Sequence, residues 1–274
     1  MPRSSSRSLS SSGMSATSPA AQQHHAQRVA LVTGAGGGIG RAIALALARD
    51  GLQVIALGRH ADKLAATRAL VEAGGGVCSA IVGDLRHSDW YAELRARAAR
   101  VDVVVHNATS FPVYGNLEEV PSAQFDEVHE TVVLGPARIC AHLLPAMRAA
   151  RFGRIVFVGS IAGTNGARRQ AAYSSAKAAL HGLVRSLALE TARDGITVNL
   201  VEPGVVMTER VLEAIPEATR QALVANTPMG RPGQAEEIAE AVAFLASDKA
   251  SYITGATLPV TGGLGLGLFP PTMG

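Results

Sequence analysis

Three residues in the middle of the chain have the types and spacing needed for proton transfer at a carbonyl or hydroxyl oxygen. Ser160 lies thirteen residues before Tyr173, and Lys177 lies four residues after that tyrosine. On a helix, positions i and i+4 share one face, so the phenol and the ammonium group would lie side by side. A phenol has an ordinary pKa of about 10, and a neighbouring lysine cation lowers it by favouring the phenolate. The serine hydroxyl would orient a substrate oxygen toward the tyrosine. The alternative is that Tyr173 and Lys177 lie on a solvated helix surface and have no catalytic role.

A glycine-rich segment near the start of the chain has the pattern of a phosphate-binding turn. An apolar stretch at residues 28–33 predicts a buried strand, glycines follow from Gly34 to Gly40, and a helical pattern comes next. Glycines let the backbone turn tightly and approach a pyrophosphate, which binds at the positive N-terminus of the helix. Strand, turn and helix together indicate a dinucleotide-binding unit. A glycine-rich loop without a ligand is the alternative, and the flanking strand and helix argue against it.

The rest of the chain alternates strands and helices, which is typical of a parallel sheet with helices on both faces. Strands are predicted at 53–58, 77–83, 101–106, 153–159 and 196–202, and helices at 60–73, 87–100, 122–150 and 171–194. We therefore expect an α/β fold of the Rossmann type, a doubly wound parallel sheet of about seven strands. It should form one catalytic domain over residues 27–274. Ligands of such sheets bind beyond the carboxyl ends of the strands, where Gly34, Asn107, Ser160 and Pro203 all fall.

The composition agrees with a single enzyme domain and argues against other classes. Hydrophobic residues make up 47% of the 274 residues, and the formal net charge is only +3. Nucleic-acid binding needs a concentrated basic face, and a membrane span needs an apolar run of about 18 residues. The sequence shows neither. Cys78 and Cys140 have no metal-binding or redox spacing and are expected to be buried small hydrophobes in a reducing compartment. We expect a cytoplasmic protein without a metal site.

The first 26 residues differ from the rest of the chain. They are rich in serine and contain no acidic residue, so they cannot bury enough apolar surface to fold. We expect residues 1–26 to be a flexible tail. An upstream start, with Met14 as the real initiator, and a transit peptide are the alternatives.

The end of the second predicted strand indicates which dinucleotide is bound. An acidic residue there would bind the ribose 2′-hydroxyl of NAD, but the chain has Gly58 followed by Arg59. Arginine offers a planar, permanently charged fork to a 2′-phosphate, and no carboxylate repels that phosphate. The sequence therefore favours NADP over NAD. Arg41, on the first helix, is expected to add to the positive field.

These motifs together resemble the short-chain dehydrogenase/reductase family over residues 27–265. Ser160, Tyr173 and Lys177 match its catalytic residues, and residues 33–40, 106–109 and 202–208 match its cofactor-binding segments. The resemblance implies that the cofactor is held by Gly34, Gly38, Ile39, Gly40, Arg59, Asp84, Leu85, Asn107, Ala108, Tyr173, Lys177, Pro203, Gly204, Val206 and Thr208. Within the family, the chain is most similar to the subgroup that resembles 3-oxoacyl-acyl-carrier-protein reductase.

The resemblance implies reduction of a ketone to a secondary alcohol with NADPH. Tyr173 would be the acid/base, Ser160 would polarise the carbonyl oxygen, and Lys177 would bind the nicotinamide ribose. The substrate would be a small carbonyl compound, acyl or polyketide in type, either free or linked to a carrier. An NAD-dependent alcohol dehydrogenase and a non-catalytic NADP-binding sensor or scaffold remain open. The family also implies a homodimer or homotetramer, formed through the predicted helices at 122–150 and 171–194.

The substrate pocket is expected next to the catalytic residues. Its walls would be Ser110, Phe111 and Tyr114, residues 163–168, and an amphipathic segment at 207–225 that would act as a mobile lid. Two arginines, Arg168 and Arg169, would either attract a phosphate of the carrier or lie on the solvated surface.

One position departs from the family at the proton relay. The resemblance places Val132 where the family has an asparagine whose backbone carbonyl holds a relay water. Pro136 follows four residues later, lacks an N–H, and clashes with the carbonyl at i−4. We expect Pro136 to open the helix and free that carbonyl in place of the asparagine. The alternative is that the relay is lost. Thr109 and Thr261 are further departures from the family pattern.

Overall fold

The computed structural model describes residues 28–110 and 114–266 of the chain. The tail expected at residues 1–26 and the pocket residue Phe111 lie outside these ranges, so those two expectations remain predictions.

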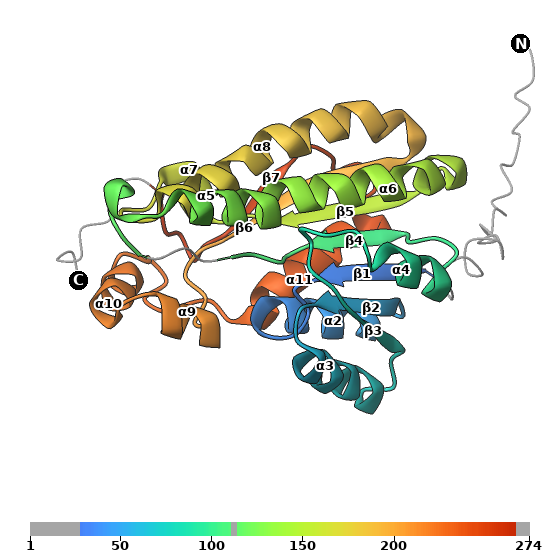
Figure 1. Ribbon diagram of the computed structural model, residues 1–274, viewed down its shortest axis with the longest axis horizontal. Helices are drawn as coiled ribbons and strands as arrows, with labels where there is room; N and C mark the ends of the chain where they lie inside the picture. Colours follow the sequence, from blue (N-terminus) through green and yellow to red (C-terminus); the bar gives the residue numbers. More distant parts are fainter. Residues whose placement is uncertain (1–27, 111–113, 267–274) are drawn as a thin grey trace, which may run out of the picture.

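Within the described residues, seven strands form a single parallel sheet in the order β3-β2-β1-β4-β5-β6-β7 (Figure 1). Their bounds are β1 (Val29–Thr33), β2 (Gln53–Gly58), β3 (Cys78–Val82), β4 (Val103–His106), β5 (Gly153–Val158), β6 (Ile196–Pro203) and β7 (Thr257–Val260). All six neighbouring pairs run parallel. The expected doubly wound parallel sheet is confirmed.

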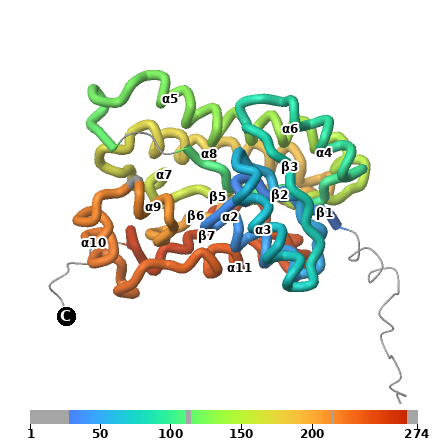
Figure 2. The backbone as a smooth tube through the Cα atoms, turned by 60° about the horizontal axis from the view of Figure 1, so that its bottom comes forward, coloured from blue at the N-terminus to red at the C-terminus, as the bar shows by residue number. Residues whose placement is uncertain are grey.

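Helices cover both faces of this sheet, as Figures 1 and 2 show. One face carries α2 (Gly38–Arg49), α3 (Ala61–Ala73) and α11 (Ala235–Ala246), and the other carries α4 (Tyr91–Arg97), α6 (Gly135–Ala150) and α8 (Ala171–Thr191). Short 3-10 helices of the described residues lie at Leu117–Glu119, Ala192–Asp194 and Asp248–Ala250. Helix α11, which packs against α2, was not among the helices predicted from the sequence.

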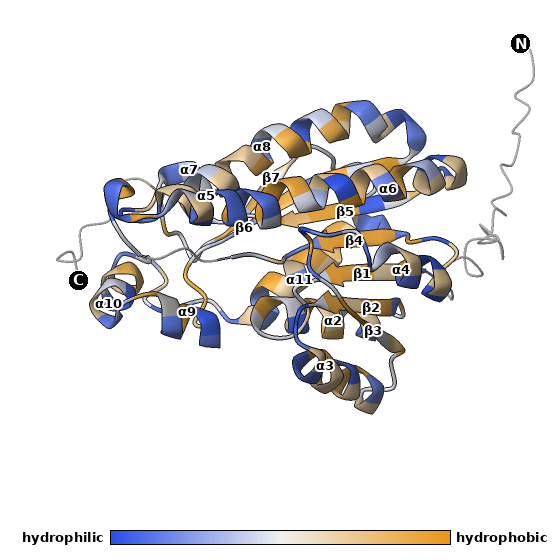
Figure 3. Cartoon of the chain, in the orientation of Figure 1, coloured by the Kyte–Doolittle hydropathy of each residue, from blue (hydrophilic) through white to orange (hydrophobic). Residues whose placement is uncertain are grey.

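The central strand explains why the fold has two hydrophobic cores. Successive side chains of a strand point to opposite faces, and every residue of β1 is buried. Ala30 and Val32 pack into the core under α2 and α11, whereas Val29 and Leu31 pack into the core under α6 and α8. Figure 3 shows the corresponding apolar strands between helices that carry both polar and apolar residues.

The long helix expected at 122–150 is divided in the structure. It consists of α5 (Ser122–His129), a π-helical segment (Glu130–Leu134) and α6. The N–H of Gly135 donates to the carbonyl of Glu130, five residues earlier, instead of to Thr131, four residues earlier. Pro136 comes directly after this turn, so the local opening lies where the proline predicts it.

Further elements close the carboxyl end of the sheet. Helix α7 (Ile161–Asn165) follows β5, and α9 (Glu209–Ala214) and α10 (Glu217–Ala225) follow β6. The latter two lie beyond the strand ends, in the position expected for the lid (Figure 1). No helix in the described part of the chain is long and apolar enough to cross a membrane.

Candidate active site

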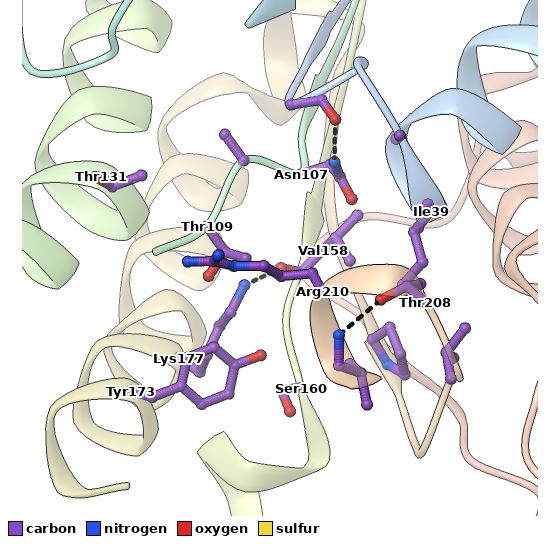
Figure 4. A pocket seen from close by; sticks show the side chains of 18 of the residues that line it. Ile39, Asn107, Thr109, Thr131, Val158, Ser160, Tyr173, Lys177, Thr208 and Arg210 are labelled. Atoms are coloured by element: carbon purple, nitrogen blue, oxygen red, sulfur yellow. Dashed lines mark hydrogen bonds between the residues drawn. The ribbon is translucent and has the colours of Figure 1, made fainter. Parts of the chain in front are cut away.

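A cavity of about 680 Å³ lies at the carboxyl ends of the strands. It is lined by every residue that the sequence assigned to catalysis or to the cofactor: Gly34, Gly38, Ile39, Gly40, Arg59, Asp84, Leu85, Asn107, Ala108, Ser160, Tyr173, Lys177, Pro203, Gly204, Val206 and Thr208. Figure 4 shows several of them converging from different elements. The fold therefore brings these residues into one site, although their individual roles remain proposals.

Two glycines of the turn at one end of the cavity, Gly34 and Gly40, have no room for a larger residue. Gly34 has a φ of +68°, and a Cβ on Gly40 would lie 2.2 Å from the carbonyl oxygen of Gly34. Asn107 braces this turn from β4, because its Nδ2 donates to the carbonyl oxygens of Thr33 at 3.0 Å and Gly34 at 3.3 Å. The result is an open backbone surface at the N-terminus of α2, which suits a pyrophosphate.

Basic side chains gather beside the turn, and two of them were not predicted. Arg59, His60 and Lys63 line the cavity at the end of β2 and the start of α3. His60 and Lys63 lie within one helical turn of Arg59, a proximity in sequence that could have indicated them. Arg41 was expected to contribute to this field, but it does not line the cavity. Its guanidinium donates to the carbonyl of Gly36 and to Thr67, and so supports the turn from behind.

The one acidic residue among those expected to hold the cofactor, Asp84, is already bonded to an arginine. Asp84 accepts hydrogen bonds from the Arg86 guanidinium at 2.7 Å and 3.0 Å. These bonds lower the pKa of Asp84 to about 2. The carboxylate therefore stays ionised in the cavity wall at neutral pH.

The catalytic candidates meet at the opposite end of the cavity. Ser160 caps α7, and its Oγ accepts a hydrogen bond from the N–H of Ala162 at 3.2 Å. Tyr173 and Lys177 lie one turn apart on α8 and are both buried. The Lys177 ammonium donates to the carbonyl of Val158 at 2.7 Å. In Figure 4, the Tyr173 hydroxyl points toward Ser160, and Lys177 approaches from the same helix.

The electrostatics of these groups differ from the sequence-based expectation. Burial raises the pKa of Tyr173, and the hydrogen bond with Ser160 opposes that increase. Lys177 was expected to be the main factor lowering the tyrosine pKa, but burial lowers the pKa of Lys177 itself to about 7. Removal from water disfavours both the phenolate and the ammonium ion. The Ser160 hydrogen bond thus opposes the rise in the tyrosine pKa, and the lowered pKa of Lys177 lies near neutral pH.

Some of the residues expected to form the substrate pocket line the cavity, and others do not. Tyr114, Gly166, Ala167 and Arg168 line it, together with lid residues Val211, Ile215 and Leu223. Ser110 does not line it, because its Oγ donates to Glu127. Gly163 does not line it either, since it packs against the backbone of α8. Arg169 lies over the Tyr114 ring and 3.6 Å from a carboxylate oxygen of Glu119. Of the two arginines considered, only Arg168 lines the cavity.

The opened helix reaches the cavity through a residue that the sequence did not single out. Thr131 lines the cavity, whereas Val132 is 2% exposed and packs in the core. The α-helical donor for the Thr131 carbonyl is the Gly135 N–H, which bonds to Glu130 instead. The π-helical donor would be Pro136, which has no N–H. The proline and the π-helical turn thus deprive the Thr131 carbonyl of both helical partners.

Three comparisons with known proteins found similar sequences and structures. The model of the family described as enoyl-(acyl carrier protein) reductase matches residues 34–265. The 3-oxoacyl-[acyl-carrier-protein] reductase FabG of Escherichia coli (strain K12) is 40% identical over 238 residues, which cover 86% of this chain and 97% of that protein. The reductase of the same name from Pseudomonas aeruginosa is 41% identical over 241 residues, which cover 86% of this chain and 97% of that protein. A solved structure of 3-oxoacyl (acyl-carrier-protein) reductase from Agrobacterium tumefaciens C58, with NADP bound, has a TM-score of 0.79 and 34% identity, and covers 86% of this chain and 93% of that chain.

Proposed function

Because this chain belongs to the short-chain dehydrogenase/reductase family, we propose that it reduces a ketone to a secondary alcohol with Tyr173 as the acid/base. The observation that carries the proposal is the convergence of Ser160, Tyr173 and Lys177 on the cavity that also contains the glycine turn. A Rossmann-type turn alone would be equally useful to a protein that only binds a nucleotide. The three reactive side chains beside it are what catalysis needs.

NADP(H) is the cofactor of the chain, and the residues present fit it. The glycine turn is packed too tightly for a Cβ at Gly40, whereas nothing lies within 4 Å of the point where a Cβ of Gly37 would be, at the N-cap of α2, which leaves the backbone there open to a pyrophosphate. No carboxylate stands at Gly58, and three basic side chains, Arg59, His60 and Lys63, line the cavity at the end of β2, where a 2′-phosphate is expected. The relative from Agrobacterium tumefaciens was solved with NADP bound. These observations favour NADP over NAD, and with it the reductive direction.

The chain's own groups provide the proton chemistry of the reaction. Bound NADPH supplies the hydride to the carbonyl carbon of the substrate. Ser160 Oγ hydrogen-bonds the carbonyl oxygen, and the Tyr173 hydroxyl transfers its proton to the developing alkoxide at that oxygen. Lys177 lies one helical turn from Tyr173, and its pKa of about 7 suits it to return a proton to the tyrosine. The raised pKa of Tyr173 keeps the phenol protonated, as a proton donor must be.

The carbonyl freed at the opened helix completes the path for the proton. The resemblance predicted an acceptor at Val132, and the structure places Thr131 on the cavity wall. We assign the relay contact to the backbone at this turn. A water bound by the free carbonyl would connect Lys177 with solvent, as the family's asparagine carbonyl does.

The proposed substrate is an acyl or polyketide ketone. The lid contributes apolar side chains to the cavity, including Val211, Ile215 and Leu223, and Leu264 adds another from the C-terminal segment. Arg168, exposed at the cavity wall, is suited to a phosphate of a carrier-linked substrate. The relatives named above are reductases of 3-oxoacyl groups on acyl carrier protein.

An assay of NADPH consumption tests this function. The absorbance of NADPH is followed with a panel of 3-oxoacyl thioesters, cyclic diketones and simple ketones, and the panel is repeated with NADH. We expect reduction of at least one 3-oxoacyl thioester, with NADPH preferred. Faster oxidation of alcohols with NAD would favour the alcohol dehydrogenase instead. No turnover by a folded, NADPH-binding protein would favour the sensor.

We also propose a homo-oligomer. Helix α8 has an outward face with small residues, including exposed Ala178, Ala179 and Gly182, and the apolar Leu189 is 86% exposed. On this helix, nothing lies within 4 Å of the point where a Gly182 Cβ would be. An exposed face with small residues and an apolar side chain suits close packing against a second copy around a two-fold axis.

A further inference from the structure

A buried carboxylate lies behind the catalytic residues, and the mechanism above does not use it. Glu202 is the penultimate residue of β6 and is 3% exposed. It directly precedes Pro203 and Gly204, which line the cavity. A carboxylate removed from water is strongly destabilising unless hydrogen bonds and an opposite charge compensate it. Its partners therefore show what it stabilises.

The partners of Glu202 come from two helices that carry the catalytic side chains. Thr164 of α7 donates its hydroxyl to Glu202 Oε1 at 2.8 Å, and His181 Nε2 of α8 lies 3.0 Å from the same oxygen. The Thr164 hydroxyl and His181 Nε2 are themselves 3.3 Å apart. One carboxylate oxygen thus connects the end of β6 with α7 and with α8.

Each of these two helices holds one part of the catalytic group. Ser160 is the N-cap of α7, which is only five residues long. His181 lies one turn after Lys177 and two turns after Tyr173, so all three share a face of α8. A movement of α7 against α8 would therefore change the distance between Ser160 and Tyr173.

Two glycines allow this arrangement to be compact. A Cβ on Gly163 would lie 2.8 Å from the carbonyl carbon of Lys177, so α7 rests directly on the backbone of α8. A Cβ on Gly159 would lie 3.4 Å from Cγ of Glu202, so the carboxylate side chain passes against the residue that precedes Ser160. The glutamate is thus packed between the catalytic segments as well as hydrogen-bonded to them.

We propose that Glu202 is a positioning residue of the active site, whose carboxylate fixes α7 against α8 through Thr164 and His181 and so sets the distance between Ser160 and Tyr173. The inference rests on the proposed ketone reduction, because it assigns these contacts a role in that reaction. Glu202 itself need not touch the substrate or the cofactor.

Thr164→Val and Thr164→Ser test the proposal in the full-length protein. Valine has nearly the shape of threonine but no hydroxyl, whereas serine keeps the hydroxyl. We expect Thr164→Val to lower kcat about 10- to 100-fold, the range that a small misplacement of reacting groups produces, with the Kd for NADPH and the Tm nearly unchanged. Hydrogen exchange of the α7 amides should become faster. Thr164→Ser should restore most of kcat, and Glu202→Gln should lose less than Glu202→Ala because its amide oxygen still accepts both bonds.

A double-mutant cycle with Ser160→Ala separates positioning from general support of the fold. If Thr164 acts through Ser160, adding Thr164→Val to Ser160→Ala should change kcat little further. Additive effects, unchanged exchange of α7, or an unchanged kcat in Thr164→Val would each overturn the proposal. A wild-type protein that reduces no ketone would refute the proposed function instead. The exchange of α7 would then still decide whether the carboxylate fixes the two helices.

Discussion

The N–H of Gly135 donates to the carbonyl of Glu130, five residues earlier, and therefore not to the carbonyl of Thr131, four residues earlier. The next residue, Pro136, cannot donate to the Thr131 carbonyl either, because proline has no N–H. The Thr131 carbonyl is thereby left without either helical donor, in a residue that lines the cavity, and the chain lacks the asparagine that is usual in the family. A substitution of Pro136 tests whether this turn contributes to activity.

Pro136→Ala should restore an N–H at the opened turn and let the helix close. Under this proposal, kcat falls about tenfold or more, equivalent to ~1.4 kcal/mol of barrier, while NADPH affinity is nearly intact. Val132→Asn should gain little, because Val132 is buried in the core and Thr131 is the residue at the cavity. Steady-state kinetics and a fluorescence titration of NADPH measure both quantities. A kinetically silent Pro136→Ala, or a tenfold gain from Val132→Asn, would show that the relay lies elsewhere.

Arg59→Glu should move the preference from NADPH toward NADH. The substitution removes a charge-assisted contact worth about 1.5–3 kcal/mol and adds a carboxylate that repels the 2′-phosphate. Lys63→Ala should weaken NADPH binding without helping NADH, because it removes positive charge only. The ratio of Kd values for the two cofactors is the readout. Arg168→Glu, at the substrate side of the same cavity, is the matched control and should leave this ratio unchanged.

Lys177→Met tests the buried ammonium through the pH dependence of stability. The pKa of Lys177 is about 7 in the folded chain and higher when the chain unfolds, so between these values the unfolded state binds more protons. Burial of the lysine therefore destabilises the wild type fully below about pH 7, and the penalty disappears toward pH 10. The unfolding free energy of the variant relative to the wild type should fall over this interval. Urea denaturation at several pH values measures it, and a constant difference would contradict the lowered pKa.

Gly182→Arg tests the proposed assembly. The position is open on the monomer, so the variant should fold, but an arginine would prevent α8 from packing closely against a second copy. Light scattering should show a dimer or tetramer for the wild type and smaller particles for the variant. Ala69→Arg, on the exposed face of α3, is the control and should assemble normally. A fully active wild-type monomer would exclude the oligomer.

The sequence predicted best those features whose place in the fold follows from the local residue pattern. The strand at 53–58 was predicted to the residue, because an apolar stretch buried on both faces and ended by Gly58 leaves few alternatives. Gly34, Asn107, Ser160 and Pro203 were expected in one site, since each follows a predicted strand and such ends meet at one edge of a parallel sheet, and all four line the cavity.

Other features depend on contacts between distant segments. The direction of the Tyr173 pKa shift follows from burial, which residue spacing does not give. Ser110 donates to Glu127 of α5 and does not line the cavity, so its contact depends on the position of α5. The contact of Glu202 with Thr164 and His181 joins three elements that lie up to 38 residues apart in sequence. No local pattern indicates such a contact.

Tyr173→Phe tests the central claim most directly. The substitution removes only the hydroxyl from a buried ring that points toward Ser160. With the best ketone of the panel, we expect wild-type turnover of NADPH and a kcat at least about 10²-fold lower in the variant, the usual contribution of a general acid. NADPH binding should be retained. A Tyr173→Phe variant that reduces the ketone as fast as the wild type would contradict the assignment of Tyr173 as the acid/base.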